Sequence, residues 1–218
     1  MGNTTFGPLV TVSATYGAGG SVIAPRLAEE FGVPFIDRLI SADFSQDAAA
    51  ELRSQEGLCE GEQEASPAGR FLSYFARAAS VGAMMAPDPL LEDDDGIRTR
   101  TESALIDVKG GAPGVVLGRA GAIVLASRPR AYHVRLDGAA ERRVAWAATY
   151  ESLGLEAARR RQTETDKTRT MFVKRLYRVD PSNPGLYHLI LDPTVLGLDR
   201  ATQVLVGAVR AYFEANPE

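Results

Sequence analysis

Short apolar runs alternate with helix-like periodicity near the start of the chain. A β-branched run over residues 9–13 leads into a glycine-rich turn at 16–20, and apolar positions then follow helical spacing over 21–31. Gly32 is a typical helix stop, and a second apolar run covers 33–36. The pattern predicts a strand, a glycine turn, a helix and a second strand, which together form a right-handed βαβ unit.

The same alternation returns after residue 113. Strands are predicted over 114–118, 132–137 and 187–192, and helices over 119–127, 139–153, 155–176 and 199–215. Strands that alternate with helices favour a parallel sheet with helices on both faces. The expected fold class is therefore α/β, a three-layer parallel sheet in one domain of 218 residues, with no internal repeat.

The pattern weakens between residues 41 and 112, which are expected to form an insertion between the second and third strands. Residues 54–69, rich in Glu, Gly and Ala, predict a mobile loop or a loose helix. Helical spacing returns over 70–86 and over 98–109. The 70–86 helix could serve as a partner-binding face, including one for a homodimer.

Composition removes several classes of function. The formal net charge of −4 argues against wholesale binding to nucleic acid or to an anionic membrane. One cysteine, Cys59, and two histidines leave no disulfide framework and no expected metal site. The first residues do not resemble a signal peptide and no apolar run could span a bilayer, so the expected location is the cytoplasm.

The glycine turn is the first candidate for chemistry. Gly17, Gly19 and Gly20 lie between a predicted strand and a helix N-terminus, where backbone N–H groups can converge on phosphate. Against the phosphate-binding pattern G-x-x-x-x-G-K-[ST], the chain keeps Gly19 and Ser21. It has Ala14 in place of the first glycine and Gly20 in place of the lysine that contacts the β- and γ-phosphates.

Two alternatives remain for this turn. It could be a tight connection that holds no ligand. It could also be a dinucleotide-binding turn with Asp37 as the acidic residue, but Val22 stands where that fingerprint needs its third glycine.

Charged residues near the predicted strand ends are further candidates. Arg119 follows the third strand, where ligands of open parallel sheets bind and where a guanidinium can hold a phosphate by two hydrogen bonds. Asp37 and Arg38 end the second strand and could receive an acceptor or a ribose. A basic run over 159–175 precedes the last strand. It could be a solvated helix face or a lid that covers the phosphate during transfer.

Five segments in this order resemble the cytidylate kinase-like family, a bacterial relative of the nucleoside monophosphate kinases. They are residues 11–21, 33–38, 116–119, 166–169 and 187–192. The resemblance covers about 9–40 and 113–206. It implies a P-loop kinase fold with a core over 9–40 and 113–215, an acceptor-binding insertion over 41–112 and a lid over 155–178.

The resemblance also implies roles for individual residues, with ATP and Mg²⁺ as cofactors and a nucleotide as the small-molecule partner. The phosphate loop would be Gly17, Ala18, Gly19, Gly20 and Ser21. Asp37 and Arg38 would border the acceptor, Arg119 would hold its phosphate, and Asp166 and Arg169 would belong to the lid. Lys167 would partly replace the missing loop lysine.

The chain departs from true cytidylate kinases at Gly20 and at Ala120, where those enzymes have the loop lysine and an aspartate that helps to read cytosine. Ser21 also replaces an arginine that is frequent in the kinase-like branch. Two functions therefore stay open: phosphoryl transfer from ATP–Mg²⁺ to a nucleoside monophosphate or similar acceptor, and binding of a nucleotide or other phosphometabolite without turnover.

Overall fold

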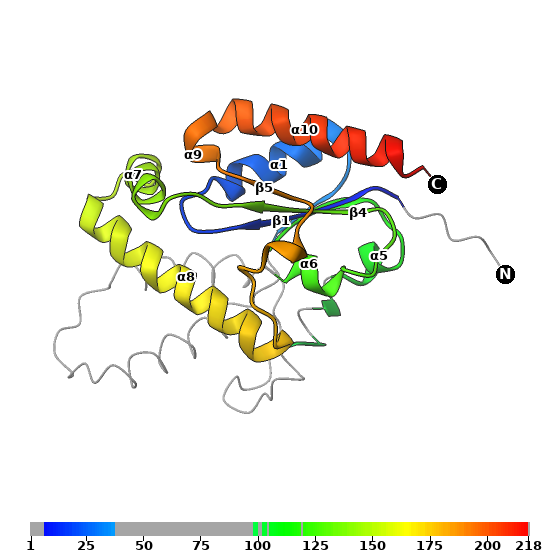
Figure 1. The fold of residues 1–218 in the computed structure, drawn as a ribbon, viewed down its shortest axis with the longest axis horizontal. Coiled ribbons are helices and arrows are strands. Elements are labelled where there is room, and N and C mark those ends of the chain that lie inside the picture. Colours follow the sequence, from blue (N-terminus) through cyan, green and yellow to red (C-terminus); the bar gives the residue numbers. More distant parts are fainter. Residues whose placement is uncertain (1–6, 38–97, 100–101, 104, 119, 218) are drawn as a thin grey trace, which may run out of the picture.

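The computed structural model describes residues 7–37, 98–99, 102–103, 105–118 and 120–217. Its centre is a five-stranded parallel sheet in the order β2-β3-β1-β4-β5 (Figure 1). The strands are β1 Leu9–Ala14, β2 Phe35–Asp37, β3 Gly114–Leu117, β4 Ala131–Leu136 and β5 Leu189–Leu191. The predicted α/β class with a parallel sheet is confirmed.

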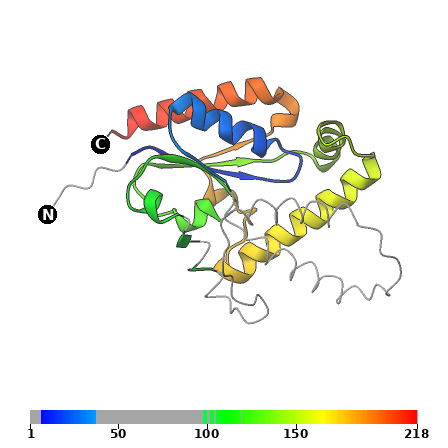
Figure 2. The same cartoon turned by 180° about the vertical axis from the view of Figure 1, so that it is seen from behind.

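Helices lie on both faces of the sheet (Figures 1 and 2). One face carries α1 (Gly20–Phe31) and α10 (Leu198–Ala215), which is preceded by the short α9 (Pro193–Leu196). The other face carries the short α5 (Ile106–Lys109) and α6 (Gly121–Val124) and the long α8 (Leu155–Tyr177). Helix α7 (Ala140–Tyr150) lies beside the connection from β1 to α1 and packs on α8.

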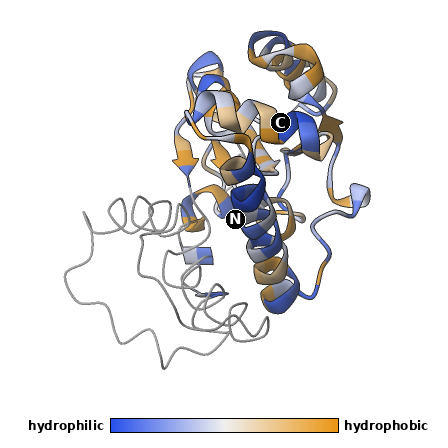
Figure 3. Ribbon diagram, turned by 90° about the vertical axis from the view of Figure 1, so that its left-hand side faces the viewer, coloured by the Kyte–Doolittle hydropathy of each residue, from blue (hydrophilic) through white to orange (hydrophobic). Residues whose placement is uncertain are grey.

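Side chains along β1 point alternately to the two faces of the sheet, and each face has its own hydrophobic core. Val10 and Val12 point into the cluster under α1 and α10, whereas Leu9 packs with Val116 against α5 and α6. The strand is buried on both faces, as expected for a parallel sheet with helices on both sides. In Figure 3 the strands carry mostly hydrophobic colours, whereas α8 shows long hydrophilic stretches.

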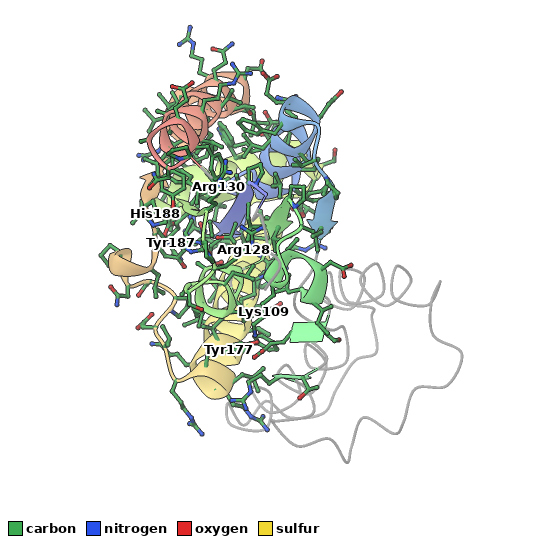
Figure 4. All side chains as sticks on the ribbon, turned by 90° about the vertical axis from the view of Figure 1, so that its right-hand side faces the viewer. Lys109, Arg128, Arg130, Tyr177, Tyr187 and His188 are labelled. Atoms are coloured by element: carbon green, nitrogen blue, oxygen red, sulfur yellow. The ribbon has the colours of Figure 1, made fainter. Side chains whose placement is uncertain are left out.

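A buried arginine joins the loops at the amino ends of the strands (Figure 4). The Arg128 guanidinium donates hydrogen bonds to six main-chain carbonyls, those of Gly7, Val108, Gly111, Ala112, Pro129 and Arg130. Burial, together with the neighbouring Arg130, lowers the pKa of Arg128. Because these carbonyls belong to α5 and to the loops before β1, β3 and β4, this one side chain connects the amino ends of the strands.

Several predicted elements are shorter in the structure. The helix expected over 119–127 is the single turn α6, and the strand expected over 187–192 contains only Leu189–Leu191 after a 3₁₀ turn at Pro184–Leu186. In the 98–109 segment, the described residues 98–99 and 102–103 are helical, but Leu105 lies in a turn before α5. The predicted 54–69 loop and 70–86 helix lie outside the described residues.

No helix in the described part of the chain has the length and apolar character needed to cross a membrane.

Candidate functional site

The glycine turn, residues 16–21, lies where the connections of the sheet change direction. The chain leaves β1 toward β2 through α1, and it leaves β4 toward β5 through α7 and α8. Ligands of open α/β sheets bind at such switch points, beyond the carboxyl ends of the strands. Thr15 and Asp137 follow these two strands and meet there, because the Thr15 hydroxyl donates to Asp137 Oδ1 at 3.0 Å.

Two glycines of the turn have backbone conformations that side chains disfavour. Gly17 has φ of 76° and Gly19 has φ of 77°. A Cβ at Gly17 would overlap the carbonyl oxygen of Arg143, and one at Gly19 would lie 2.5 Å from Leu198 Cδ2. Close packing of α7 and α10 therefore requires glycine at both positions.

Four N–H groups of the turn are available to a ligand. The Ala18 N–H donates to Thr15 O at 3.1 Å and closes the turn. The N–H groups of Gly17, Gly19, Gly20 and Ser21 donate no hydrogen bond to an acceptor among the described residues. Unsatisfied donors at the start of a helix form a favourable environment for an anion.

The replacement of the loop lysine by Gly20 goes together with a second departure from the phosphate-binding pattern, at Ala14. A Cβ at Gly20 would lie 2.5 Å from the Cβ of Ala14 and 3.3 Å from Leu117 Cδ1. Ala14 occupies the position of the first glycine in that pattern. The alanine therefore fills the space that a side chain at position 20 would need, so these two replacements fit each other.

A carboxylate from α8 approaches the turn. The Tyr16 N–H donates to Asp166 Oδ1 at 2.9 Å, and Arg143 Nη1 donates to Asp166 Oδ2 at 2.8 Å. The guanidinium also donates to Tyr16 O at 2.7 Å and, through Nε, to Gly138 O at 2.9 Å. Arg143, buried on α7, thus joins the glycine turn to α8.

The Tyr16 side chain adds a second link from the turn to α7 and α8. Its hydroxyl donates to Glu151 Oε2 at 2.8 Å, and Arg161 Nη1 donates to the same oxygen at 2.6 Å. Burial first, and then the nearby Glu151 carboxylate, raise the pKa of Tyr16 well above its ordinary value. The phenol therefore stays neutral and acts as an anchor.

Asp137 is held as a carboxylate beneath the turn. Arg135 donates to Asp137 Oδ2 through Nε at 3.0 Å and Nη2 at 2.7 Å, and the Gly138 N–H donates to Oδ1 at 2.8 Å. Burial alone would raise the pKa of Asp137, but the hydrogen bonds from Gly138, Arg135 and Thr15 outweigh it and hold the pKa below its usual range. This ion pair fixes the end of β4 beside the turn.

The structure brings some of the predicted site residues together at the glycine turn and places others away from it. The phosphate-loop residues, including the fully buried Ala18, form the turn and the start of α1, and Asp166 faces them from α8. On the same helix Lys167 is exposed and Arg169 is half-buried. Asp37 ends β2, which β3 separates from β1. Arg38 and Arg119 lie outside the described residues.

Sequence reasoning missed Arg143. In the sequence it is one of two adjacent arginines on the helix predicted over 139–153. Its role depends on a contact with Tyr16, 127 positions earlier in the chain. The only signal was an arginine soon after the end of a strand, which is a common arrangement.

Comparison with known proteins identifies the family of the chain. The family model for the cytidylate kinase-like family matches residues 9–194. A cytidylate kinase from Methanopyrus kandleri strain AV19 is 25% identical over 208 residues, which cover 94% of this chain and 95% of that protein.

Two solved structures are also similar to the chain. An uncharacterized protein from Eubacterium ventriosum ATCC 27560 has a TM-score of 0.62 at 14% identity, and the match covers 94% of this chain and 99% of that one. A gluconokinase from Sinorhizobium meliloti 1021 has a TM-score of 0.47 at 15% identity, with 98% and 99% covered. With a family model that matches most of its length, the chain belongs to the cytidylate kinase-like family.

Proposed function

We propose that the protein binds the phosphates of a nucleotide on the glycine turn and transfers the terminal phosphoryl group of ATP to a nucleoside monophosphate or a similar small acceptor. The observation that carries the proposal is a set of four N–H groups at the switch point of the sheet, those of Gly17, Gly19, Gly20 and Ser21, which donate to no acceptor in the part of the chain that the structure describes. Membership of the family, and the cytidylate kinase among its relatives, support the nature of the acceptor.

The proposed reaction moves one phosphoryl group. An oxygen of the acceptor phosphate attacks the γ-phosphorus of ATP, the bond to the β,γ-bridging oxygen breaks, and ADP leaves. Enzymes catalyse this transfer mainly by positioning the reactants and by neutralising charge. Glycine-turn N–H groups would hold the donor phosphates, whereas Arg119 would hold the acceptor phosphate.

Cations from α8 would replace the missing loop lysine in this proposal. Arg169 would neutralise charge on the transferring group, and Lys167 would partly substitute for the ammonium that Gly20 lacks. Asp37 and Arg38 would border the acceptor. A mobile lid with arginines can supply such charges at the moment of transfer.

The residues at the turn fit a magnesium ion that arrives with a nucleotide. Among the described residues there is no group of three or more His, Cys, Asp or Glu side chains that could hold a metal ion. Mg²⁺ in phosphoryl-transfer sites keeps several waters and needs only one or two protein oxygens besides the phosphates. The exposed Ser21, in the first turn of α1, would supply one such oxygen.

A second function, nucleotide binding without turnover, is favoured by the contact between Ala14 and position 20. Because the alanine Cβ fills this space, the structure has no room for the lysine that normally contacts the β- and γ-phosphates. The N–H groups that would hold phosphate do not depend on that lysine.

Two assays on the same purified protein distinguish these functions. Thermal unfolding is followed with ATP–Mg²⁺ and each common nucleoside monophosphate, and product formation is measured with the same pairs. Transfer that falls at least 10²-fold in Arg119→Ala and in Arg169→Ala supports the kinase. A nucleotide-dependent rise in melting temperature without product supports the binding function, and no rise with any nucleotide contradicts both.

A further inference from the structure

The carboxylate of Asp166 already occupies two donors of the kind that a phosphate would use. One is the backbone N–H of Tyr16 in the glycine turn, and the other is the guanidinium of Arg143. A phosphate group is recognised by the same pair of donors, a backbone N–H near a helix N-terminus and an arginine. An anion from the protein itself therefore lies at the edge of the proposed phosphate site.

We propose that Asp166 is an internal competitor for phosphate at the Tyr16 N–H, and that Arg143 pairs with the phosphate that displaces it. The inference rests on the proposed nucleotide binding and adds a regulatory contact to that site. Arg143 becomes a phosphate-binding residue whose Nη1 is presented to the ligand only after the carboxylate of α8 leaves.

Arg143 is held independently of Asp166. Its Nε donates to Gly138 O, and its Nη1 donates to Tyr16 O as well as to Asp166. Because these two main-chain acceptors stay in place when the carboxylate moves, the guanidinium keeps its orientation toward the turn. A fixed donor of this kind loses little side-chain freedom when a phosphate binds.

Helix α8 is also held without Asp166. Gln162 Nε2 donates to Ala140 O at 3.2 Å, Arg159 pairs with Glu141 at 2.6 Å, and Ala158 is fully buried against α7. The Asp166 side chain is 22% exposed, so an incoming anion can reach it from solvent. Exchange of carboxylate for phosphate therefore needs only local movement around Asp166.

Isothermal titration calorimetry with pyrophosphate, and separately with ATP–Mg²⁺, tests the competition. Asp166→Asn keeps an acceptor for the Tyr16 N–H but removes the competing charge, so both probes should bind about tenfold more tightly than to the wild type. Glu164→Gln is the matched control, since Glu164 is an exposed carboxylate two residues earlier on the same helix. It should change either affinity less than twofold. Arg143→Lys, which cannot keep both main-chain hydrogen bonds and face the ligand, should weaken binding about tenfold or more.

The outcomes separate this inference from the proposed function. If the wild type binds both probes and Asp166→Asn binds them equally or more weakly, the competition is wrong and nucleotide binding stands. If neither protein binds either probe, both are wrong. Should Asp166→Asn fail to fold, the ¹⁵N–¹H signal of Tyr16 in the wild type decides: displacement predicts that it shifts during a pyrophosphate titration, and an unmoved signal overturns the inference.

Discussion

Glycines in the turn between β1 and α1 determine what can pack around it. Gly17 and Gly19 combine positive φ with close approach of α7 and α10, whereas Gly20 is needed because Ala14 lies opposite. The N–H groups of this turn that donate to no described residue are a consequence of the same geometry. At the scale of single residues, the candidate site is thus defined by backbone atoms and by the side chains that exclude a lysine.

Gly20→Ala should lower the free energy of unfolding by about 1–3 kcal/mol, because the new Cβ would overlap that of Ala14. Gly207→Ala is the matched control on α10, where a Cβ meets nothing within 4 Å, and should raise stability by up to about 1 kcal/mol. Urea unfolding measures both. In an Ala14→Gly background, Gly20→Ala should lower the free energy of unfolding by a smaller amount. An unchanged loss would contradict the steric contact between positions 14 and 20.

Arg128→Met should lower the free energy of unfolding by about 3 kcal/mol, since it removes a buried guanidinium that donates hydrogen bonds to several main-chain carbonyls. Arg26→Met removes an arginine whose partner, Asp199, is 85% exposed, and should change stability by less than about 1 kcal/mol. Thermal and urea unfolding provide the comparison. Equal effects at the two positions would show that the Arg128 hydrogen bonds contribute little.

At the scale of elements, histidine contacts connect β4 to both neighbouring strands. His133 Nδ1 lies 2.7 Å from Thr11 Oγ1 of β1, its partner in the parallel register. The backbone N–H of His133 donates to the side-chain Nδ1 of His188, just before β5, at 2.9 Å, and the two imidazoles stack. Figure 4 shows His188 beside Tyr187 at this edge of the molecule. These contacts favour neutral histidines.

The free energy of unfolding should therefore fall as the pH drops from about 6.5 to about 4. Burial, with a smaller effect of His188, lowers the pKa of His133 to about 4. Between these values the unfolded chain binds a proton that the folded chain excludes, which costs up to about 3 kcal/mol. When urea unfolding is measured across this range, the free energy of unfolding should fall less steeply with decreasing pH for His133→Asn than for the wild type. The same slope in both proteins would contradict this account.

Elements were predictable where their pattern was local. The strand over 9–14 and the helices α1, α8 and α10 follow from apolar spacing and from Gly32, which ends α1 in the left-handed conformation. The shortened β5 was not predictable, because Tyr187 looks like a strand residue, yet its hydroxyl donates to Pro181 O in the preceding loop. Tertiary contacts outweighed β-propensity there.

At the scale of the whole molecule, the site combines segments that are far apart in the chain. Sequence alone placed the glycine turn and suggested Asp166, because both belong to recognisable patterns. It could not place Arg143 or the overlap of Ala14 with position 20, since these depend on how α7 and α1 pack on the sheet. The parallel sheet places backbone donors and a buried arginine together at its switch point.

The most direct test of this account follows the backbone N–H groups themselves. In ¹⁵N–¹H spectra of the full chain titrated with ATP–Mg²⁺, the signals of Gly17, Gly19, Gly20 and Ser21 should shift together with a single dissociation constant. Signals of α10 residues far from the turn should stay in place. Shifts elsewhere with the four turn signals unmoved, or no shift at saturating ATP, would contradict the claim that this turn binds phosphate.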